Sequence, residues 1–211
     1  HVWPLPALWA TRMFAALRIP PNAVTVVGIV SMALAAFLWA SGELALGLLF
    51  AWLMTFLDTV DGKLARVTVT SSRLGNKLDH ITDLVHPPVW WACLAFGLAA
   101  QSGAAMQQRL LEAFLVILTC YTIGRAVEIL FKKTVGYNAY LWRRFDSAFR
   151  LVVARRNTIL LIITLGLLLG VPAQAYVVAA VWSLISVGIQ LVRFFQALQA
   201  SRRGHARSWL M

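Results

Sequence analysis

The sequence predicts an all-α integral membrane protein with six transmembrane helices, preceded by an amphipathic helix that lies at the membrane interface. Three observations support this prediction. Apolar residues make up 60% of the 211 residues, the mean hydropathy is +0.75 and there are nine tryptophans, which is unusual for a soluble domain. Six apolar stretches follow one another, and crossing the ~30 Å hydrocarbon core takes about 20 helical residues. Basic residues gather on one side of these stretches.

The first expected element is the amphipathic helix, over residues 5–18. Its apolar side chains recur at a spacing near 3.6, which is typical of a helix in the interface rather than of a disordered tether. The six spans are separated by glycine, serine and proline turn signals. We expect them at residues 23–41, 44–65, 76–100, 107–131, 157–171 and 173–198. Because the fifth is short, it is expected to begin a turn or two earlier, inside the preceding basic segment.

The basic residues set the expected orientation. The net charge of +11 is interleaved with the spans rather than gathered on a soluble face, which indicates membrane topology and no nucleic-acid partner. Most Lys and Arg side chains fall on one side, and Arg109 is the clear exception. By the positive-inside rule that side is cytoplasmic, and an even number of spans puts both termini there. We expect an integral protein of a bacterial inner membrane.

Residues 1–211 are expected to form a single transmembrane domain. Cys93 and Cys120 lie in apolar stretches and indicate neither a disulfide nor a cysteine metal site. Because the sequence starts at His1 rather than at methionine, a piece of a longer protein is one interpretation, and a soluble domain ahead of His1 stays open.

Four of the eight acidic residues fall within 26 positions of this apolar chain, as Asp58, Asp61, Asp79 and Asp83. The first two are three residues apart and the last two are four apart, so each pair shares one helix face. An aspartate in the middle of a span costs about 2.5 to 3.5 kcal/mol, so the four need a cationic partner. Nearby Lys and Arg side chains are one such partner, and a bound metal ion is another.

The small residues among these carboxylates favour the metal. Gly62 and Gly75 weaken a helix interior by about 1 kcal/mol each relative to alanine, but they permit close approach of a ligand. Ala65 is small for the same reason, and an ion-pair network needs none of the three. Carboxylate oxygens beside small residues suit a hard divalent cation such as Mg²⁺, which bridges carboxylates to substrate phosphates. The sequence therefore predicts a metal-bound diphosphate as the ligand.

The string from Asp58 to Asp83 also matches a known pattern. It reads D-x2-D-G-x2-A-R-x8-G-x3-D-x3-D and resembles the signature of the CDP-alcohol phosphotransferases, also called CDP-alcohol phosphatidyltransferases. The six spans, the preceding amphipathic helix and the residues Pro21 to Thr25 at the start of the first span look like this family too. The resemblance covers nearly the whole chain.

The resemblance implies a six-helix membrane enzyme, commonly a homodimer, that transfers a phospho-alcohol group from a CDP-linked donor to the hydroxyl of a polar alcohol and releases CMP. The group is most often phosphatidyl and the donor CDP-diacylglycerol, in phospholipid biosynthesis. The implied cofactor is Mg²⁺ or Mn²⁺, with Asp58, Asp61 and Asp79 as metal ligands. Asp83 would be the general base while also touching a metal ion. The donor's cytidine diphosphate would contact a further set of residues: Gly62, Ala65, Arg66, Gly75, Asn22 and Thr25.

The acceptor alcohol is less well defined by the sequence. Family members that use inositol phosphate or glycerol phosphate look similar in placing basic residues near the ends of the later spans. We expect an acceptor-phosphate pocket built from some of these side chains: Arg125, Arg155, Arg156 and Arg193. Two other roles explain the arginines of the cytoplasmic connection equally well: they set the orientation of the spans, and they attract anionic lipid headgroups. Glu128, three residues after Arg125, offers that arginine an ion pair instead.

His86 lies one helical turn after Asp83 and is a candidate for proton transfer or acceptor contact. A buried, hydrogen-bonded histidine is the other interpretation. Two further function classes use the same aspartates. An intramembrane prenyltransferase binds a diphosphate through aspartates and Mg²⁺, but it usually has more spans and another aspartate spacing. A cation channel or transporter would use them as an ion path, which leaves the glycines unexplained.

Overall fold

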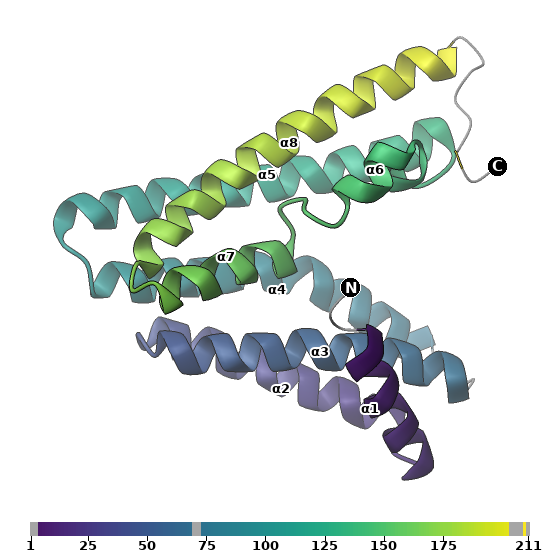
Figure 1. The fold of residues 1–211 in the computed structure, drawn as a ribbon, viewed down its shortest axis with the longest axis horizontal. Helices are drawn as coiled ribbons and strands as arrows, with labels where there is room; N and C mark the ends of the chain where they lie inside the picture. The colour runs from purple at the N-terminus through teal and green to yellow at the C-terminus, as the bar shows by residue number, and fades with distance from the viewer. Residues whose placement is uncertain (1–3, 69–72, 203–208, 210–211) are drawn as a thin grey trace. The chain divides into compact units, whose positions relative to one another are not determined.

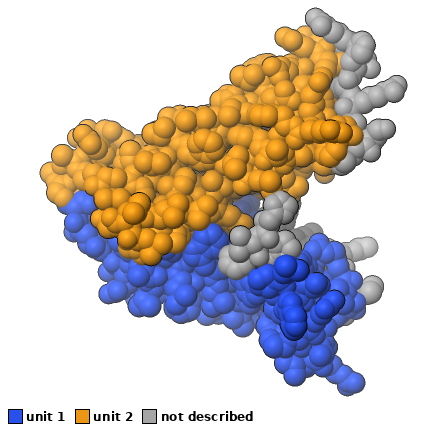
Figure 2. Space-filling view, viewed as in Figure 1, with its two compact units in different colours: residues 1–102 blue, residues 103–211 orange. Residues whose placement is uncertain are grey.

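The computed structural model describes residues 4–68, 73–202 and 209, while the side chains of Pro4 and of residues 73–81 lie outside the description. Within these ranges all regular structure is helical, and Figure 1 labels the helices in chain order. The chain divides into two compact units, residues 1–102 and 103–211, coloured separately in Figure 2. We describe each unit by itself.

The first unit contains α1 (Pro4–Ala16), α2 (Pro21–Ala40), α3 (Leu44–Thr68) and α4 (Arg73–Ala100). The start of α2 follows from two prolines: Pro20 is extended, and Pro21 takes the first helical position, where a missing N–H costs nothing. α2 packs against both α3 and α4, and α1 packs against α3.

Tryptophans fill the α2–α4 contact. Trp39, Trp90 and Trp91 are at most 2% exposed, and the rings of Trp39 and Trp90 meet edge to face with centroids 5.4 Å apart. The indole N–H of Trp90 donates to the carbonyl oxygen of Met32 at 2.9 Å, so α4 is hydrogen-bonded to α2. At Gly97, a Cβ would overlap the carbonyl oxygen of Trp39, so these two helices approach at a glycine. These contacts fix the position of α4 within the first unit.

α1 corresponds to the predicted amphipathic helix. Its small residues Ala7 and Thr11 are buried, whereas Leu5, Trp9 and Met13 are exposed. An exposed apolar face is what a helix in the interface presents to lipid. The interfacial position itself stays a prediction.

The second unit contains α5 (Ala104–Val135), the 3-10 turn η1 (Ala139–Leu141), α6 (Arg144–Phe149), α7 (Arg156–Leu168) and α8 (Pro172–Arg202). α5 and α7 both pack against α8. Gly136, with φ of 91°, ends α5 in the left-handed conformation that glycine adopts without strain. A Cβ at Gly166 would overlap that of Ala175, so α7 and α8 also approach at a glycine.

All six predicted spans correspond to helices, but they differ in length. Within the described ranges, α2, α3, α5 and α8 are long and apolar enough to cross a membrane, which confirms a helical integral membrane protein. α7 has 13 residues, about 20 Å at 1.5 Å per residue, which is shorter than the hydrocarbon core. The count of six spans therefore remains a prediction.

The expectation that the fifth span begins a turn or two before residue 157 is wrong. α7 begins at Arg156, and Arg155 before it is extended, with φ of −117° and ψ of 173°. The backbone just upstream is hydrogen-bonded to α8: Ala154 N–H donates to Ser186 Oγ at 3.0 Å, and the indole N–H of Trp182 donates to the carbonyl of Val152. The Ala154 N–H, engaged in this way, cannot donate within a helical hydrogen-bond ladder.

Candidate active site

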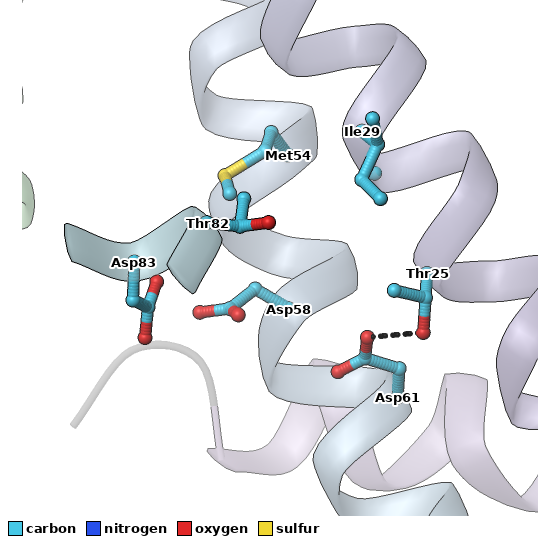
Figure 3. Close-up of a pocket in the computed structure, with 8 residues that line it drawn as sticks. Thr25, Ile29, Met54, Asp58, Asp61, Thr82 and Asp83 are labelled. Atoms are coloured by element: carbon cyan, nitrogen blue, oxygen red, sulfur yellow. Dashed lines mark hydrogen bonds between the residues drawn. The ribbon is translucent and has the colours of Figure 1, made fainter. Parts of the chain in front are cut away.

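Three helices of the first unit meet around one pocket, shown in Figure 3. Its atom-free space amounts to about 320 Å³ up to the open mouth. The lining residues are Thr25, Gly28 and Ile29 from α2, Met54, Asp58 and Asp61 from α3, and Thr82 and Asp83 from α4. Three of the four predicted aspartates thus share one pocket.

The packing of α3 explains why two of its carboxylates point the same way. Asp58 and Asp61 lie three residues apart on one side of the helix. Leu57, Val60 and Leu64 form a buried stripe that packs with residues of α1 and α2. Because this stripe fixes the rotation of α3 about its axis, the two half-buried aspartates are held at the pocket.

Hydrogen bonding orients Asp61. The hydroxyl of Thr25 on α2 donates to Asp61 Oδ2 at 2.9 Å, and it also lies 3.1 Å from the carbonyl oxygen of Pro21, one turn earlier. The bond to an ionised carboxylate is the stronger of the two. Figure 3 shows the carboxylates of Asp58 and Asp83 turned toward each other from α3 and α4.

The chemistry of this pocket fits a hard divalent cation. Asp58, Asp61 and Asp83 offer carboxylate oxygens and Thr25 a hydroxyl, and Mg²⁺ and Mn²⁺ prefer oxygen ligands. Among the described side chains, no three His, Cys, Asp or Glu residues lie close enough to enclose a metal ion by themselves. The side chain of Asp79, the fourth predicted ligand, lies outside the described residues. Mg²⁺ usually takes part of its coordination from substrate phosphates and water.

Gly62 lies in open space rather than in a helix contact. Among the described atoms, a Cβ added there would meet nothing nearer than Arg66 Nη2, at 3.9 Å. At Gly97, in contrast, the neighbouring Trp39 backbone leaves no room for a side chain. Helix packing therefore explains Gly97, whereas no packing contact among the described residues explains Gly62.

The other predicted donor contacts are distributed differently. Thr25 lines the pocket, whereas Asn22, Ala65 and Arg66 do not, although they lie on the same helices. Asn22 is exposed in the first turn of α2, and Arg66 is exposed near the end of α3. Gly75 belongs to the part of α4 whose side chains lie outside the description.

His86 is buried and hydrogen-bonded. Its Nδ1 lies 2.7 Å from the carbonyl oxygen of Thr82, so Nδ1 carries the proton and donates. Its ring meets Trp90 edge to face, with centroids 5.0 Å apart. It follows Asp83 by one turn but is not among the pocket-lining residues. These contacts agree with the interpretation of His86 as a buried, hydrogen-bonded histidine.

In the second unit, Glu128 organises a polar cluster at the α5–α8 contact. Its carboxylate accepts hydrogen bonds from Arg155 at 2.5 Å, from the Tyr140 hydroxyl at 2.9 Å and from Arg125 at 3.3 Å. Gln190 of α8 donates to the Tyr140 oxygen at 2.7 Å. The ion pair between Arg125 and Glu128, which the sequence offered as the alternative to phosphate binding by Arg125, is therefore present.

These contacts shift two pKa values upward. Burial, with a smaller contribution from Glu128, raises the pKa of Tyr140 to about 12, although the nearby Arg155 opposes the shift. For Arg155, burial lowers the pKa, but Tyr140 and Glu128 together raise it further, so the net shift is upward. Arg155 therefore remains a permanent cation beside Glu128.

Arg193 of α8 is held by Asp146 of α6. Its Nε and Nη2 donate to the two carboxylate oxygens at 2.7 and 2.8 Å, and Nη1 donates to Gln196. The guanidinium also lies 4.4 Å from the centroid of the Trp142 ring. Arg156, the last predicted acceptor contact, is half-buried at the start of α7.

The sequence interpretation missed Asp146, Tyr140 and Gln190. One signal was available for Asp146, because it is the only acidic residue in the basic stretch from Lys132 to Arg156. A lone carboxylate among arginines indicates an ion pair. Tyr140 and Gln190 carried no comparable signal, since the bonds from Gln190 to Tyr140 and from Tyr140 to Glu128 join residues far apart in the sequence.

In a helical membrane protein, a pocket lined by three aspartates indicates a binding site for a charged ligand. Comparison with known proteins makes this specific. The profile of the CDP-alcohol phosphatidyltransferase family matches residues 18–190, and the chain belongs to this family. It is therefore a CDP-alcohol phosphotransferase, a membrane transferase of phospholipid biosynthesis.

Solved structures agree at the level of the fold. The crystal structure of Mycobacterium tuberculosis phosphatidylinositol phosphate synthase (PgsA1) with CDP-DAG bound is similar to this chain, with a TM-score of 0.64 and 20% identity over 90% of this chain and 93% of that chain. The apo form of the same synthase gives a TM-score of 0.62 and 19% identity, covering 88% and 94%. No curated protein matches the sequence significantly.

Proposed function

We propose that this protein transfers a phosphatidyl group from CDP-diacylglycerol to the hydroxyl of a polar alcohol and releases CMP. The observation that carries the proposal is the convergence of Asp58, Asp61 and Asp83 on one pocket, in a chain of the CDP-alcohol phosphatidyltransferase family. The CDP-DAG bound to the similar synthase supports the choice of donor. Family membership argues against the prenyltransferase and the channel.

The carboxylates take separate roles in the proposed reaction. Asp58, Asp61 and Asp79 would hold Mg²⁺ or Mn²⁺, and Thr25 keeps Asp61 turned into the pocket through its hydrogen bond. The bound ion would supply charge neutralisation at the donor's diphosphate oxygens. Asp83, which lines the same pocket from α4, would also contact the ion while serving as general base.

Asp83 accepts the proton of the acceptor hydroxyl as that oxygen attacks the phosphatidyl phosphorus. The new bond joins the acceptor oxygen to phosphorus, and the bond between that phosphorus and the CMP oxygen breaks. The free space beside Gly62 admits the cytidine diphosphate, and Arg66, one turn on, pairs with a phosphate oxygen. Ala65, Gly75 and Asn22 complete the proposed donor site.

For the acceptor we propose a phosphorylated alcohol, such as inositol phosphate or glycerol phosphate. The proposed phosphate ligands are Arg125, Arg155, Arg156 and Arg193. Arg125 and Arg155 already pair with Glu128, and Arg193 with Asp146, so a phosphate would compete with these carboxylates. Equal affinity for a phosphorylated and a dephosphorylated acceptor would remove this pocket.

The assembly and placement of the enzyme are part of the same proposal. We propose a homodimer in a bacterial inner membrane, with the active site and both termini on the cytoplasmic side. The excess of basic residues on one side of the spans supports this orientation. Accessibility of a protease site added after Met211 in sealed vesicles of known orientation tests it.

The test of the proposed function is CMP release by the purified protein in lipid nanodiscs. The assay contains CDP-diacylglycerol, Mg²⁺ or Mn²⁺, and one of four acceptors: inositol phosphate, inositol, glycerol phosphate or glycerol. Release that needs donor, metal and a phosphorylated acceptor is expected. Absence of CMP with every acceptor and either metal would show the proposal to be wrong.

Variants of the carboxylates separate their roles. Asp83→Asn is expected to keep metal-dependent donor binding and to lose turnover by about 10²- to 10⁴-fold, the usual contribution of a general base. Asp58→Asn is expected to lose metal-dependent donor binding itself. Glu112→Gln, which replaces an exposed carboxylate on α5, is the matched control and should change neither donor binding nor turnover. Normal turnover by Asp83→Asn would exclude that residue as the base.

A further inference from the structure

Residues 143–152, which include α6 and the turn after it, present an unexpectedly apolar surface. Phe145, Leu151 and Val152 are 54%, 60% and 49% exposed. They lie outside the helices long enough to span a membrane. Three large apolar side chains within eight residues, all open to the surroundings, call for a covering partner.

The same surface is strongly basic. Arg143, Arg144 and Arg150 are exposed among the apolar side chains. Each guanidinium rests near an aromatic ring, at 5.0, 5.7 and 6.0 Å from the centroids. Among the described residues, none of the three pairs with a carboxylate. The one acid of the segment, Asp146, is buried and bonded to Arg193, so it does not offset the charge of the exposed face.

The opposite face of this segment is packed against the rest of the second unit. The apolar side chains are therefore exposed on a segment that is held in place. Phe149 and Val153 are buried together with Tyr140. The two charge-assisted hydrogen bonds between Asp146 and Arg193 join α6 to α8. The exposed face is therefore presented by a segment of defined orientation.

Helix length places this segment at the level of the headgroups. Arg193, which holds α6, lies 21 residues after the start of α8, which is about 32 Å at 1.5 Å per residue. Arg125 lies equally far along α5. The hydrocarbon core is ~30 Å thick, so a helix that enters it at its first residue leaves it near these arginines. α6 is joined to α8 at this boundary.

We propose that the exposed face of residues 143–152 docks on anionic phospholipid headgroups. Arg143, Arg144 and Arg150 bind lipid phosphates, while Phe145, Leu151 and Val152 enter the boundary between headgroups and acyl chains. Apolar side chains set between arginines are the composition that binds this layer, and the charge is complementary to anionic lipid. The inference does not depend on the proposed catalytic roles.

Hydrogen exchange of the full-length protein in nanodiscs tests this docking. Backbone amides of 143–152 are compared in phosphatidylcholine alone and in phosphatidylcholine with about 30 mol% phosphatidylglycerol, since each basic residue near an anionic surface strengthens binding about fivefold. We expect exchange to be at least about tenfold slower with the anionic lipid. About 0.5 M salt should remove most of the difference, because it screens surface charges.

The triple variant R143Q/R144Q/R150Q is expected to exchange at the same rate in both lipids. Arg109→Gln, an exposed arginine near the start of α5, is the control and should keep the difference. Equal exchange by the unmodified protein in both lipids overturns the proposal. The proposal is also overturned if the slowing of exchange is independent of lipid charge and increases with the number of protein copies per nanodisc. A second copy of the chain would then be the partner.

Discussion

Replacing Asp146 tests how the second unit is held together. This carboxylate is 5% exposed and receives two hydrogen bonds from Arg193. It also accepts the backbone N–H of Arg143 at 3.0 Å, at the start of α6. Asp146→Ala would leave the Arg193 guanidinium next to Trp142 without a counter-ion, and it would remove the two hydrogen bonds that join α6 to α8.

The magnitude follows from the burial of the pair. Removing one partner of a buried ion pair costs about 3 to 5 kcal/mol, because the remaining charge is uncompensated. Arg193 is 21% exposed, so water offsets part of this cost and the lower figure applies. For a chain of this length, 1 kcal/mol shifts the Tm by about 2 to 4 °C, so a fall of roughly 6 to 12 °C is expected.

Thermal unfolding in detergent at a fixed scan rate measures the effect. The double variant D146A/R193M should recover part of the lost stability, since it removes the stranded charge as well. Glu112→Ala, which removes an exposed carboxylate bonded only to Gln108 in the described structure, is the control. A Tm for Asp146→Ala within about 2 °C of the control, or additive losses in the double variant, would refute this reasoning.

Two further predictions concern Tyr140 and the glycines. The pKa of Tyr140 is raised to about 12, so its stabilising contribution is complete below the unfolded value near pH 10 and is lost as the pH rises toward 12. Unfolding measured from pH 9 to 12 should show this loss in the unmodified protein and a smaller loss in Tyr140→Phe, where Tyr137, whose pKa burial also raises, still contributes. Gly97→Ala should lower the Tm because its Cβ overlaps the Trp39 carbonyl. Gly62→Ala should keep the Tm, since no described atom lies within 3.9 Å of the added Cβ, and it should weaken CDP-diacylglycerol binding. A Gly62→Ala variant with unchanged donor affinity would contradict the donor site proposed here.

Periodicity and turn signals predicted the helices well, because apolar length and Gly or Pro breaks are local properties of the chain. Every predicted span and the amphipathic helix correspond to a helix in the structure. The start of α7 was wrong for a non-local reason. Val152 and Ala154 are hydrogen-bonded to side chains of α8 more than 25 residues away, and no local pattern encodes those contacts.

For the candidate site too, local features of the sequence were predicted and contacts between distant helices were not. Spacing alone placed Asp58 and Asp61 on one face of α3, and in the structure Asp83 of α4 lines the same pocket. The bond from Thr25 to Asp61 joins residues 36 positions apart, so it depends on how α2 packs on α3. The arginines show the limit of sequence interpretation most clearly, because charge reveals a cation but not its partner.

By itself the sequence determined the helical membrane fold, the aspartate motif and the family, since each depends on residue type and spacing along one helix. Only the tertiary structure decided that Arg155 pairs with Glu128 and Arg193 with Asp146, and that Gly62 faces open space while Gly97 lies in a tight helix contact. The physical reason is that ion pairing and packing depend on distances between helices far apart in the chain. Those distances are set when the buried faces of the helices pack together.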